Sequence, residues 1–216
     1  MMSSRPLLPS ALCLGFFLAL WGLWAIPAQA EEGAATREVH TAIDQSLEIL
    51  LDPALAAPEQ RDARRERLKQ ALYPKIAFPL LARGAVGNKW NKFTPEQQAR
   101  FIEQFKRLLE DAYLSKIENY RGEKVLFTKE IEEQKGRMVR VESLVEAKGQ
   151  KFQMFYRMTP DEAGQWRIFD IVIEGVSLAN NYRSQFNATL SQKGPEGLLK
   201  ELDDKLARGP AAPAIP

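Results

Sequence analysis

Hydrophobic residues along the chain follow two different periods, and the change between them divides the sequence. Up to about residue 120 they recur every three or four residues, the spacing of one face of an α-helix. After Gly122 they alternate with polar residues, as in a strand with one buried face. From Val176 the helical spacing returns. Helices first, strands next and helices last predict an α+β fold.

Four helical segments are predicted before the strands, at residues 36–51, 59–73, 74–86 and 94–120. The third is dense in apolar residues, but Pro79 and Gly84 interrupt it, so it is either a short buried helix or two broken turns. The fourth has a defined start. Thr94 can cap it, Pro95 fits its first turn, and Gln97 completes a capping box.

Four strands separated by short polar turns are predicted at residues 125–127, 138–147, 152–158 and 166–174. Short turns between successive strands favour an antiparallel meander. Strict alternation places Phe169, Ile171 and Ile173 on one face of the last strand and Ile168 and Val172 on the other. A sheet that is apolar on both faces must be covered on both, by a two-sided core or by a core and a hydrophobic cavity. The period of the sequence does not distinguish the two.

Two helices are predicted to close the chain, one carrying Tyr182 and Phe186 and a second that opens at Pro195 with a stripe of leucines. Residues 209–216 contain three prolines and are predicted to be a flexible tail. Residues 31–208 are therefore expected to form a single domain of interleaved helical and sheet parts.

The first thirty residues have the composition of a secretory signal peptide. Arg5 precedes sixteen uncharged residues, Ala11–Ile26, and the segment ends in Ala28-Gln29-Ala30, a small-residue cleavage site. The alternative is an N-terminal anchor that is not cleaved. The chain's one cysteine, Cys13, lies inside the apolar run, so the mature chain has no disulfide, thiol nucleophile or cysteine metal site.

Charge and motifs exclude several function classes. The 30 Lys and Arg and 28 Asp and Glu residues are interspersed, without the basic stripe of a nucleic-acid-binding protein. No zinc-protease, serine-hydrolase or nucleotide-binding motif occurs, and His40 is the single histidine. No enzyme activity, metal or cofactor is predicted.

Two other functions, an enzyme and a protein-binding adaptor, each have a small set of candidate residues. Asp170 could act in acid–base chemistry with Tyr156 or Arg157, although a structural hydrogen bond or ion pair is the preferred interpretation of Asp170. The basic residues between Arg61 and Lys69 could bind a protein partner, as in a non-catalytic periplasmic adaptor or chaperone, or could be an ordinary solvated helix face.

The segment Trp166–Phe186, WRIFDIVIEGVSLANNYRSQF, carries a family resemblance. Its Asp170, its Glu-Gly-Val-Ser block ending at Ser177, and its Tyr-Arg-x-x-Phe helix resemble the periplasmic lipid-binding proteins of the Mla pathway, also called the toluene-tolerance auxiliary component family. Further matching positions are Phe78, Gly87, Trp90, Phe101, Phe105, Leu108, Leu109, Tyr113, Tyr156 and Arg157. The resemblance runs from about residue 35 to residue 208.

The resemblance implies an α+β fold whose four-stranded curved antiparallel sheet has nuclear-transport-factor-like character, with N-terminal and C-terminal helices enclosing an apolar cavity. It implies a periplasmic carrier without catalytic activity whose cargo is phospholipid, or alternatively a hopanoid or other terpenoid lipid. The implied partners are an inner-membrane ABC transporter that holds a lipid-binding ring and an outer-membrane lipoprotein–porin complex.

With a cavity implied, the large apolar residues of the long helix and of the sheet become candidates for its lining. These candidates are Phe105, Leu109, Tyr113, Val139, Val141, Tyr156, Phe169, Ile171, Ile173 and Val176. Gly175 is expected to form a bend where a side chain would clash, and Ser177 is expected to cap the helix that follows.

We predict that the exported protein is cleaved after Ala30, because Ala28-Gln29-Ala30 fits the small-residue cleavage site of a signal peptide. N-terminal sequencing of periplasmic material should begin at Glu31. Full-length protein embedded in the membrane would contradict this prediction.

Overall fold

The computed structural model describes residues 32–118, 123–147 and 149–209. The predicted signal peptide, its cleavage site and residues 210–216 of the predicted tail lie outside them. The helices are α1 Ala34–Leu51, η1 Pro53–Leu55, η2 Pro58–Gln60, α2 Arg61–Leu72, η3 Tyr73–Lys75, α3 Phe78–Val86, η4 Gly87–Lys92, α4 Pro95–Glu118 and α5 Leu178–Ala207. The strands are β1 Lys124–Glu133, β2 Met138–Ala147, β3 Gln150–Pro160, β4 Trp166–Ile173 and β5 Val176–Ser177.

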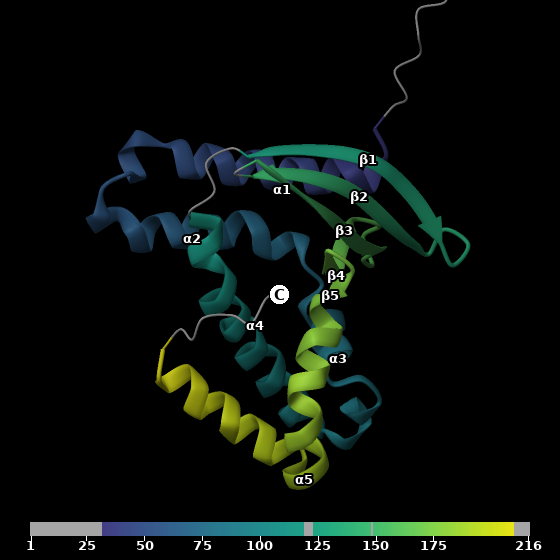
Figure 1. Ribbon diagram of the computed structural model, residues 1–216. Helices are drawn as coiled ribbons and strands as arrows, with labels where there is room; N and C mark the ends of the chain where they lie inside the picture. Colours follow the sequence, from purple (N-terminus) through teal and green to yellow (C-terminus); the bar gives the residue numbers. More distant parts are fainter. Residues whose placement is uncertain (1–31, 119–122, 148, 210–216) are drawn as a thin grey trace, which may run out of the picture. The chain divides into compact units, whose positions relative to one another are not determined.

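The strands form one curved antiparallel sheet in the order β1-β2-β3-β4-β5, which confirms the predicted α+β fold and its meander (Figure 1). The sheet has five strands rather than four, because the chain turns back after β4 and adds the two-residue β5. Glu174 and Gly175 make this turn with φ angles of 48° and 80°. Glycine suits the positive φ. The expected clash is wrong, since no atom lies within 4 Å of a Cβ placed on Gly175.

An extra residue in β4 changes the direction in which its side chains point. Phe169 has no partner in the ladder to β3, whereas Ile168 and Asp170 on either side of it are paired. Such a β-bulge shifts the alternation by one residue. Ile168 therefore shares a face with Ile171 and Ile173, and Phe169 lies on the opposite face with Asp170. The predicted grouping of Phe169 with Ile171 and Ile173 was wrong, because strict alternation assumes an unbroken ladder.

One face of the sheet, which we call the inner face, packs against α1. Their shared hydrophobic cluster, the sheet core, contains Ala35, Val39, Val139, Val141, Tyr156, Met158 and Ile168. The N-terminus of α1 has no capping side chain of its own, since its N-cap is Gly33. Glu130 of β1 instead accepts hydrogen bonds from the backbone nitrogen of Thr36, at 2.8 Å, and from its hydroxyl. The sheet thus satisfies one of the free amides of the helix that covers it.

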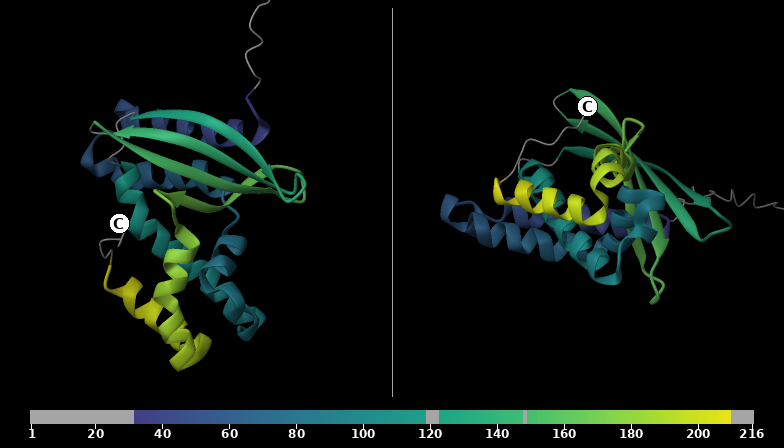
Figure 2. Two further views of the ribbon diagram at one scale, coloured as in Figure 1. Left: turned by 45° about the vertical axis from the view of Figure 1, so that its right-hand side comes forward. Right: turned by 90° about the horizontal axis from the view of Figure 1, so that it is seen from below.

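A second hydrophobic cluster, the helical core, is formed by residues of α3, α4 and α5, with Trp90 of η4 packed against it. Figure 2 shows these helices grouped below the sheet. Phe101 and Phe105 of α4 are fully buried there with their rings stacked 5.7 Å apart. Tyr182 and Phe186 of α5 pack edge-on against Phe105. The two cores draw their residues from different elements.

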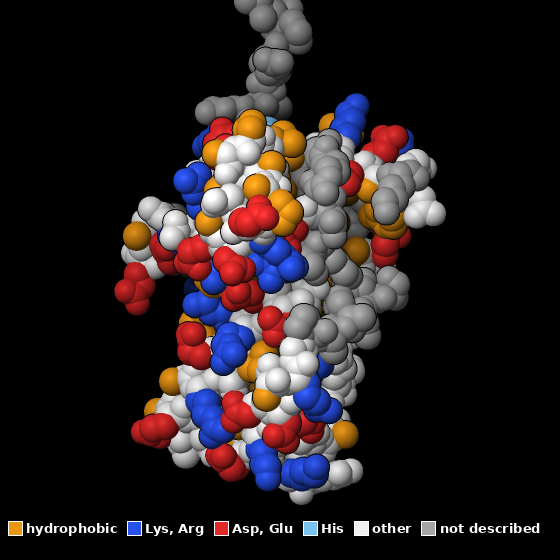
Figure 3. Space-filling model, turned by 90° about the vertical axis from the view of Figure 1, so that its left-hand side faces the viewer, with side chains coloured by type: hydrophobic (Ala, Val, Ile, Leu, Met, Phe, Trp, Pro, Cys, Tyr) orange, Lys and Arg blue, Asp and Glu red, His pale blue; other side chains and the backbone are white. Residues whose placement is uncertain are grey.

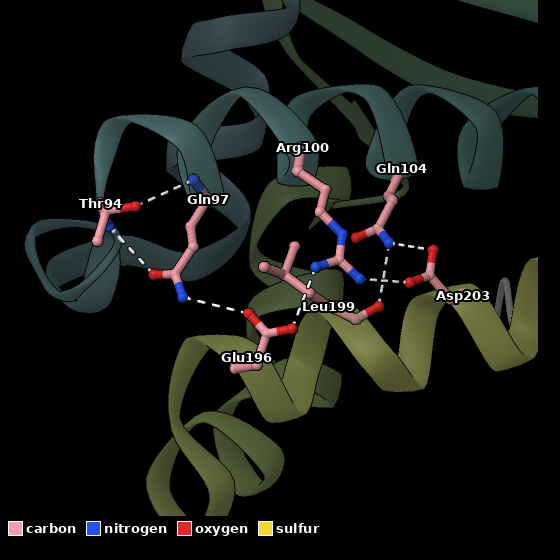
Figure 4. A network of polar contacts seen from close by, with 7 residues as sticks. All are labelled: Thr94, Gln97, Arg100, Gln104, Glu196, Leu199 and Asp203. Carbon is pink, nitrogen blue, oxygen red and sulfur yellow. Dashed lines mark hydrogen bonds and ion pairs between the residues drawn. The ribbon is translucent and has the colours of Figure 1, made fainter.

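The start of α4 follows the predicted capping box. The Thr94 backbone nitrogen donates to Gln97 Oε1 at 3.1 Å, and the Gln97 nitrogen donates to Thr94 Oγ1 at 3.3 Å. The side-chain nitrogen of Gln97 continues to Glu196 on α5 (Figure 4). The helix α5 is itself broken at Gly194, whose φ is 66°, so the predicted separate helix opening at Pro195 is confirmed.

Polar contacts hold the C-terminal half of α5 against α4. Arg100 donates to Glu196 at 3.1 Å and to Asp203 at 2.5 Å. Gln104, which is buried, donates to the Leu199 carbonyl at 3.0 Å and to Asp203 (Figure 4). These bonds lower the pKa of Asp203, chiefly through Arg100. The last helix is therefore fixed in position along α4, not only packed against it.

An ion-pair cluster connects α2 to the end of α4. Arg65 donates two hydrogen bonds to the Glu118 carboxylate, at 3.0 and 2.8 Å, and Arg61 and Arg64 lie 3.6 and 3.7 Å from it. The Glu118 side chain is only 7% exposed. Three arginines of the basic stretch thus turn toward one buried carboxylate instead of forming a uniformly solvated face.

The Glu118 cluster generates a prediction about acid stability. Burial raises the pKa of Glu118, but the Arg65 hydrogen bonds and the charges of Arg65 and Arg61 outweigh it, so the pKa lies below 4.5. A carboxyl whose pKa is lowered by folding stabilises the protein above its unfolded pKa, and this contribution is lost as pH falls through the folded value. Glu118→Gln should lower the free energy of unfolding by about 1–2 kcal/mol at pH 7.

The loss should shrink as the pH falls below about 4.5, because the unfolded carboxyl then takes up a proton, and should be smallest below the lower native pKa, where both states are protonated. Melting temperatures of wild type and Glu118→Gln between pH 7 and pH 3 measure this. Glu59→Gln is the control, because Glu59 is exposed and has no ion pair among the described residues. A stability difference that stays constant over this range would contradict the role assigned to the Glu118 charge.

Candidate functional site

A cavity of about 280 Å³ lies between the sheet core and the helical core. Its walls come from α2, η3, α3, α4, β3, β4 and the start of α5. The lining residues are Lys69, Leu72, Tyr73, Ile76, Phe78, Leu81, Lys106, Leu109, Glu110, Tyr113, Leu114, Ile117, Met154, Ile168, Ile171, Ile173 and Leu178. Most are aliphatic or aromatic. A volume near the lower end of the range for ligand pockets and an apolar lining suit a hydrocarbon group rather than a polar metabolite.

One helix and one strand supply opposite walls. Leu109, Tyr113 and Ile117 follow one another at four-residue steps on α4, so their side chains lie on the same side of the helix. Across from them, the β4 bulge brings the isoleucines of both halves of the strand to the inner face. Burial raises the pKa of the Tyr113 hydroxyl and, together with Tyr113 itself, that of Tyr182 behind it, so both stay neutral at neutral pH.

The charged residues of the lining gather at one rim, where η3 meets α2 and α4. Tyr73 donates its hydroxyl to Glu110 at 2.7 Å, and Lys69 lies 3.4 Å from the same carboxylate. Burial and the Glu110 hydrogen bond raise the pKa of Tyr73. The Lys106 ammonium lies over the Tyr73 ring, 4.7 Å from its centre. The cavity therefore has an apolar interior and a rim of polar groups that water can reach.

Four of the ten residues proposed from the sequence line this cavity: Leu109, Tyr113, Ile171 and Ile173. Their positions agree because the α4 stripe is regular and because β4 is regular beyond its bulge. Sequence analysis missed the wall formed by Leu72, Tyr73 and Ile76. Ile76 belongs to the dense apolar run that Pro79 and Gly84 interrupt, which gives no period from which to assign a face. Leu72 and Tyr73 end a segment that is otherwise very polar, so they give no apolar stripe either.

The other six residues lie elsewhere. Phe105 is at the centre of the helical core. Val139, Val141 and Tyr156 are on the inner face of the sheet, but they are buried in the sheet core with α1. The α1 helix and the cavity therefore divide the inner face between them. A regular strand pattern identifies the inner face but not this division.

Phe169 and Val176 lie away from both cores. Phe169 is on the outer face of the sheet, where the Arg157 guanidinium stacks 5.1 Å from its ring centre. Val176, in β5, is 39% exposed. Phe169 is placed by the bulge, and Val176 by the short strand β5 that follows the expected bend at Gly175; the sequence pattern indicated neither the bulge nor β5.

The residues considered for acid–base chemistry have structural partners. Asp170 is 3% exposed and accepts hydrogen bonds from the Ser177 hydroxyl at 2.6 Å and from the Ala179 nitrogen at 3.1 Å. Ser177 in turn caps α5, as expected, by accepting from the Asn180 nitrogen. Arg157 lies 4.0 Å from Asp170, on the face opposite the cavity. Asp170 thus anchors the start of α5, the role preferred from the sequence.

Two further properties concern the described part of the chain. Within it, no cluster of three or more His, Cys, Asp or Glu side chains has the arrangement of a metal site. None of its helices has both the length and the apolar character of a membrane-spanning segment.

Comparison with known proteins points to a single family. The sequence model of the MlaC protein family matches residues 40–204. A curated protein of Haemophilus influenzae, the intermembrane phospholipid transport system binding protein MlaC, is 19% identical over 147 residues, which is 67% of this chain and 69% of that protein. The crystallised phospholipid-binding protein of Ralstonia solanacearum, solved in complex with a phospholipid, is 30% identical with a TM-score of 0.71. That alignment covers 82% of this chain and 98% of the other.

Proposed function

The chain belongs to the MlaC family, and we propose that it is a periplasmic carrier that holds the acyl tails of a phospholipid in the cavity between its two cores and moves the lipid between membranes. The observation that carries this proposal is the apolar cavity itself. It lies in a chain that matches the lipid-bound Ralstonia protein over most of its length.

The chemistry of the cavity suits transport rather than catalysis. Each methylene exposed to water costs about 0.8 kcal/mol, so a lipid crosses an aqueous compartment only if its tails are covered. A cavity lined by Leu, Ile and Tyr covers them without any covalent step. Among the described residues that line the cavity, the one carboxylate, Glu110, lies at the rim, where it accepts a hydrogen bond from Tyr73 and pairs with Lys69. A carrier needs no reacting group there.

Family membership supports a proposal for the compartment and the partners. The Haemophilus relative is named as the binding protein of an intermembrane phospholipid transport system. By analogy, the exported chain works in the periplasm and exchanges lipid with an inner-membrane ABC transporter that holds a lipid-binding ring and with an outer-membrane lipoprotein–porin complex. The signal-peptide composition of residues 1–30 supports this compartment.

We predict that Ile171→Trp abolishes lipid co-purification while the protein stays folded. Ile171 lies on the cavity wall and is partly buried, so an indole at this position projects into the space that the tails would occupy. A wall beside an empty cavity accepts extra atoms that a close-packed core does not; in such a core overpacking costs about 1–3 kcal/mol. Bound lipid by native mass spectrometry and the melting temperature are measured on the same sample.

Val172→Trp is the matched control, since Val172 is the next residue of β4, is also partly buried, and points to the opposite face. It should retain its lipid. A folded Ile171→Trp protein with its full lipid load would refute the assignment of this cavity to the tails. An unfolded one would show that Ile171 is ordinary core and would remove the support for an expandable wall.

A further inference from the structure

The rim of the cavity contains a lysine whose charge is not matched by a close carboxylate. Lys69 is 2.7 Å from Glu66 and 3.4 Å from Glu110, and the pairing with Glu66 raises its pKa. Among the described residues, the acidic group within 4 Å of Lys106 is Glu103, at 3.9 Å, and the Glu103 side chain is 70% exposed. Of the two lysines that line the cavity, Lys106 is therefore the one with a weakly held counter-charge.

Two aromatic rings hold this ammonium in place. Lys106 Nζ is 4.7 Å from the centre of the Tyr73 ring and 5.6 Å from that of Phe78, and the two rings meet edge to face at 5.2 Å. Tyr73 is in turn fixed by its bond to Glu110. Cation–π contacts position a charge but leave its N–H donors free to bond an anion.

Lys106 lies where the apolar cavity meets an open polar groove, which is where the tails of a bound lipid would end and its headgroup would begin. The residues Lys69, Tyr73, Lys106 and Glu110 line both the apolar cavity and an open groove outside it, whose further lining is Glu66, Gln70, Pro74, Glu103 and Arg107. The groove has three basic and three acidic residues, so it has no net charge that would attract an anion from a distance. The molecular side carrying α2 and the C-terminal part of α5 likewise shows both charge signs intermixed (Figure 3). Recognition of an anion here must therefore be local.

We propose, building on the carrier function, that Lys106 binds the phosphate group of the lipid whose tails fill the cavity. Phosphate is the charge that all phospholipids share, and it directly follows the glycerol to which the tails are attached. A lipid with its tails between α4 and β4 has its phosphate at the rim, within the zone that Lys106 occupies. The ammonium supplies a charge-assisted hydrogen bond there. Lys106 thus gives the cavity selectivity for phospholipid over neutral lipid with the same tails.

The test compares two ligands with the same tails, one with a phosphodiester headgroup and one with a free hydroxyl in its place. Affinities of the mature protein for dioctanoyl phosphatidylglycerol and for dioctanoylglycerol are measured by competition against a fluorescent acyl-chain probe. Lys106→Gln should weaken phosphatidylglycerol binding by about tenfold or more, equivalent to about 1.4 kcal/mol, and leave dioctanoylglycerol binding unchanged. Lys106→Arg should keep the wild-type preference. Lys92→Gln, an exposed lysine on η4 outside the cavity lining, controls for the change in net charge.

Each other outcome decides against the proposal in a distinct way. Equal losses for both ligands would assign Lys106 a structural role in the wall. Unchanged affinities would mean that the phosphate is bound elsewhere or not at all. Displacement of phosphatidylglycerol by an equal concentration of inorganic phosphate would identify a free-anion site instead of a headgroup site. A wild-type protein that binds neither lipid would refute the carrier function itself, and the Lys106 proposal with it.

Discussion

The structure depends on one constraint: an apolar cavity stays open in a folded protein only if its walls are held apart by packing that does not need the cavity. Protein interiors otherwise close around voids, because lining atoms without partners lose their dispersion contacts. Here the two walls belong to two separate hydrophobic cores. The helix α4 contributes both to the packing of the helical core and to the wall of the cavity. Its N-terminal half buries Phe101 and Phe105 in the helical core, and its C-terminal half presents Leu109 and Tyr113 to the cavity.

Polar contacts at the ends of the cavity fix the spacing of the walls. Arg65 and Glu118 connect α2 to the last turn of α4, and Tyr73 and Glu110 connect η3 to the middle of the same helix. Ion pairs and hydrogen bonds have preferred distances, whereas apolar contacts can slide. Because these contacts lie at the perimeter, they fix α2 and η3 relative to α4 without placing a polar group in the interior.

Regular elements could be predicted from the sequence, and irregular ones could not. The capping box of Thr94 and Gln97, the α4 stripe and the break before Pro195 follow local rules that fix three or four residues at a time. The bulge at Phe169 and the short β5 depend on contacts with β3 and α5, which no local pattern records. The cavity lining was predicted only where regular elements supply it. Val139 and Val141 lie on the inner face, as predicted, but α1 covers them there. Which part of that face α1 covers is set by tertiary packing.

The extra residue in β4 also affects which insertions and deletions this strand can tolerate. If all residues of β4 followed a regular ladder, Asp170 would point to the same face as Ile168, toward the apolar cavity, while Ile171 and Ile173 would face outward. Loss of Phe169 itself would have no such effect, because Ile168 and Asp170 already pair with the consecutive residues Met158 and Arg157. A relative could therefore shorten β4 by one residue at this point and keep the cavity. An insertion or deletion elsewhere in the strand would instead require polar and apolar side chains to be exchanged along half of it.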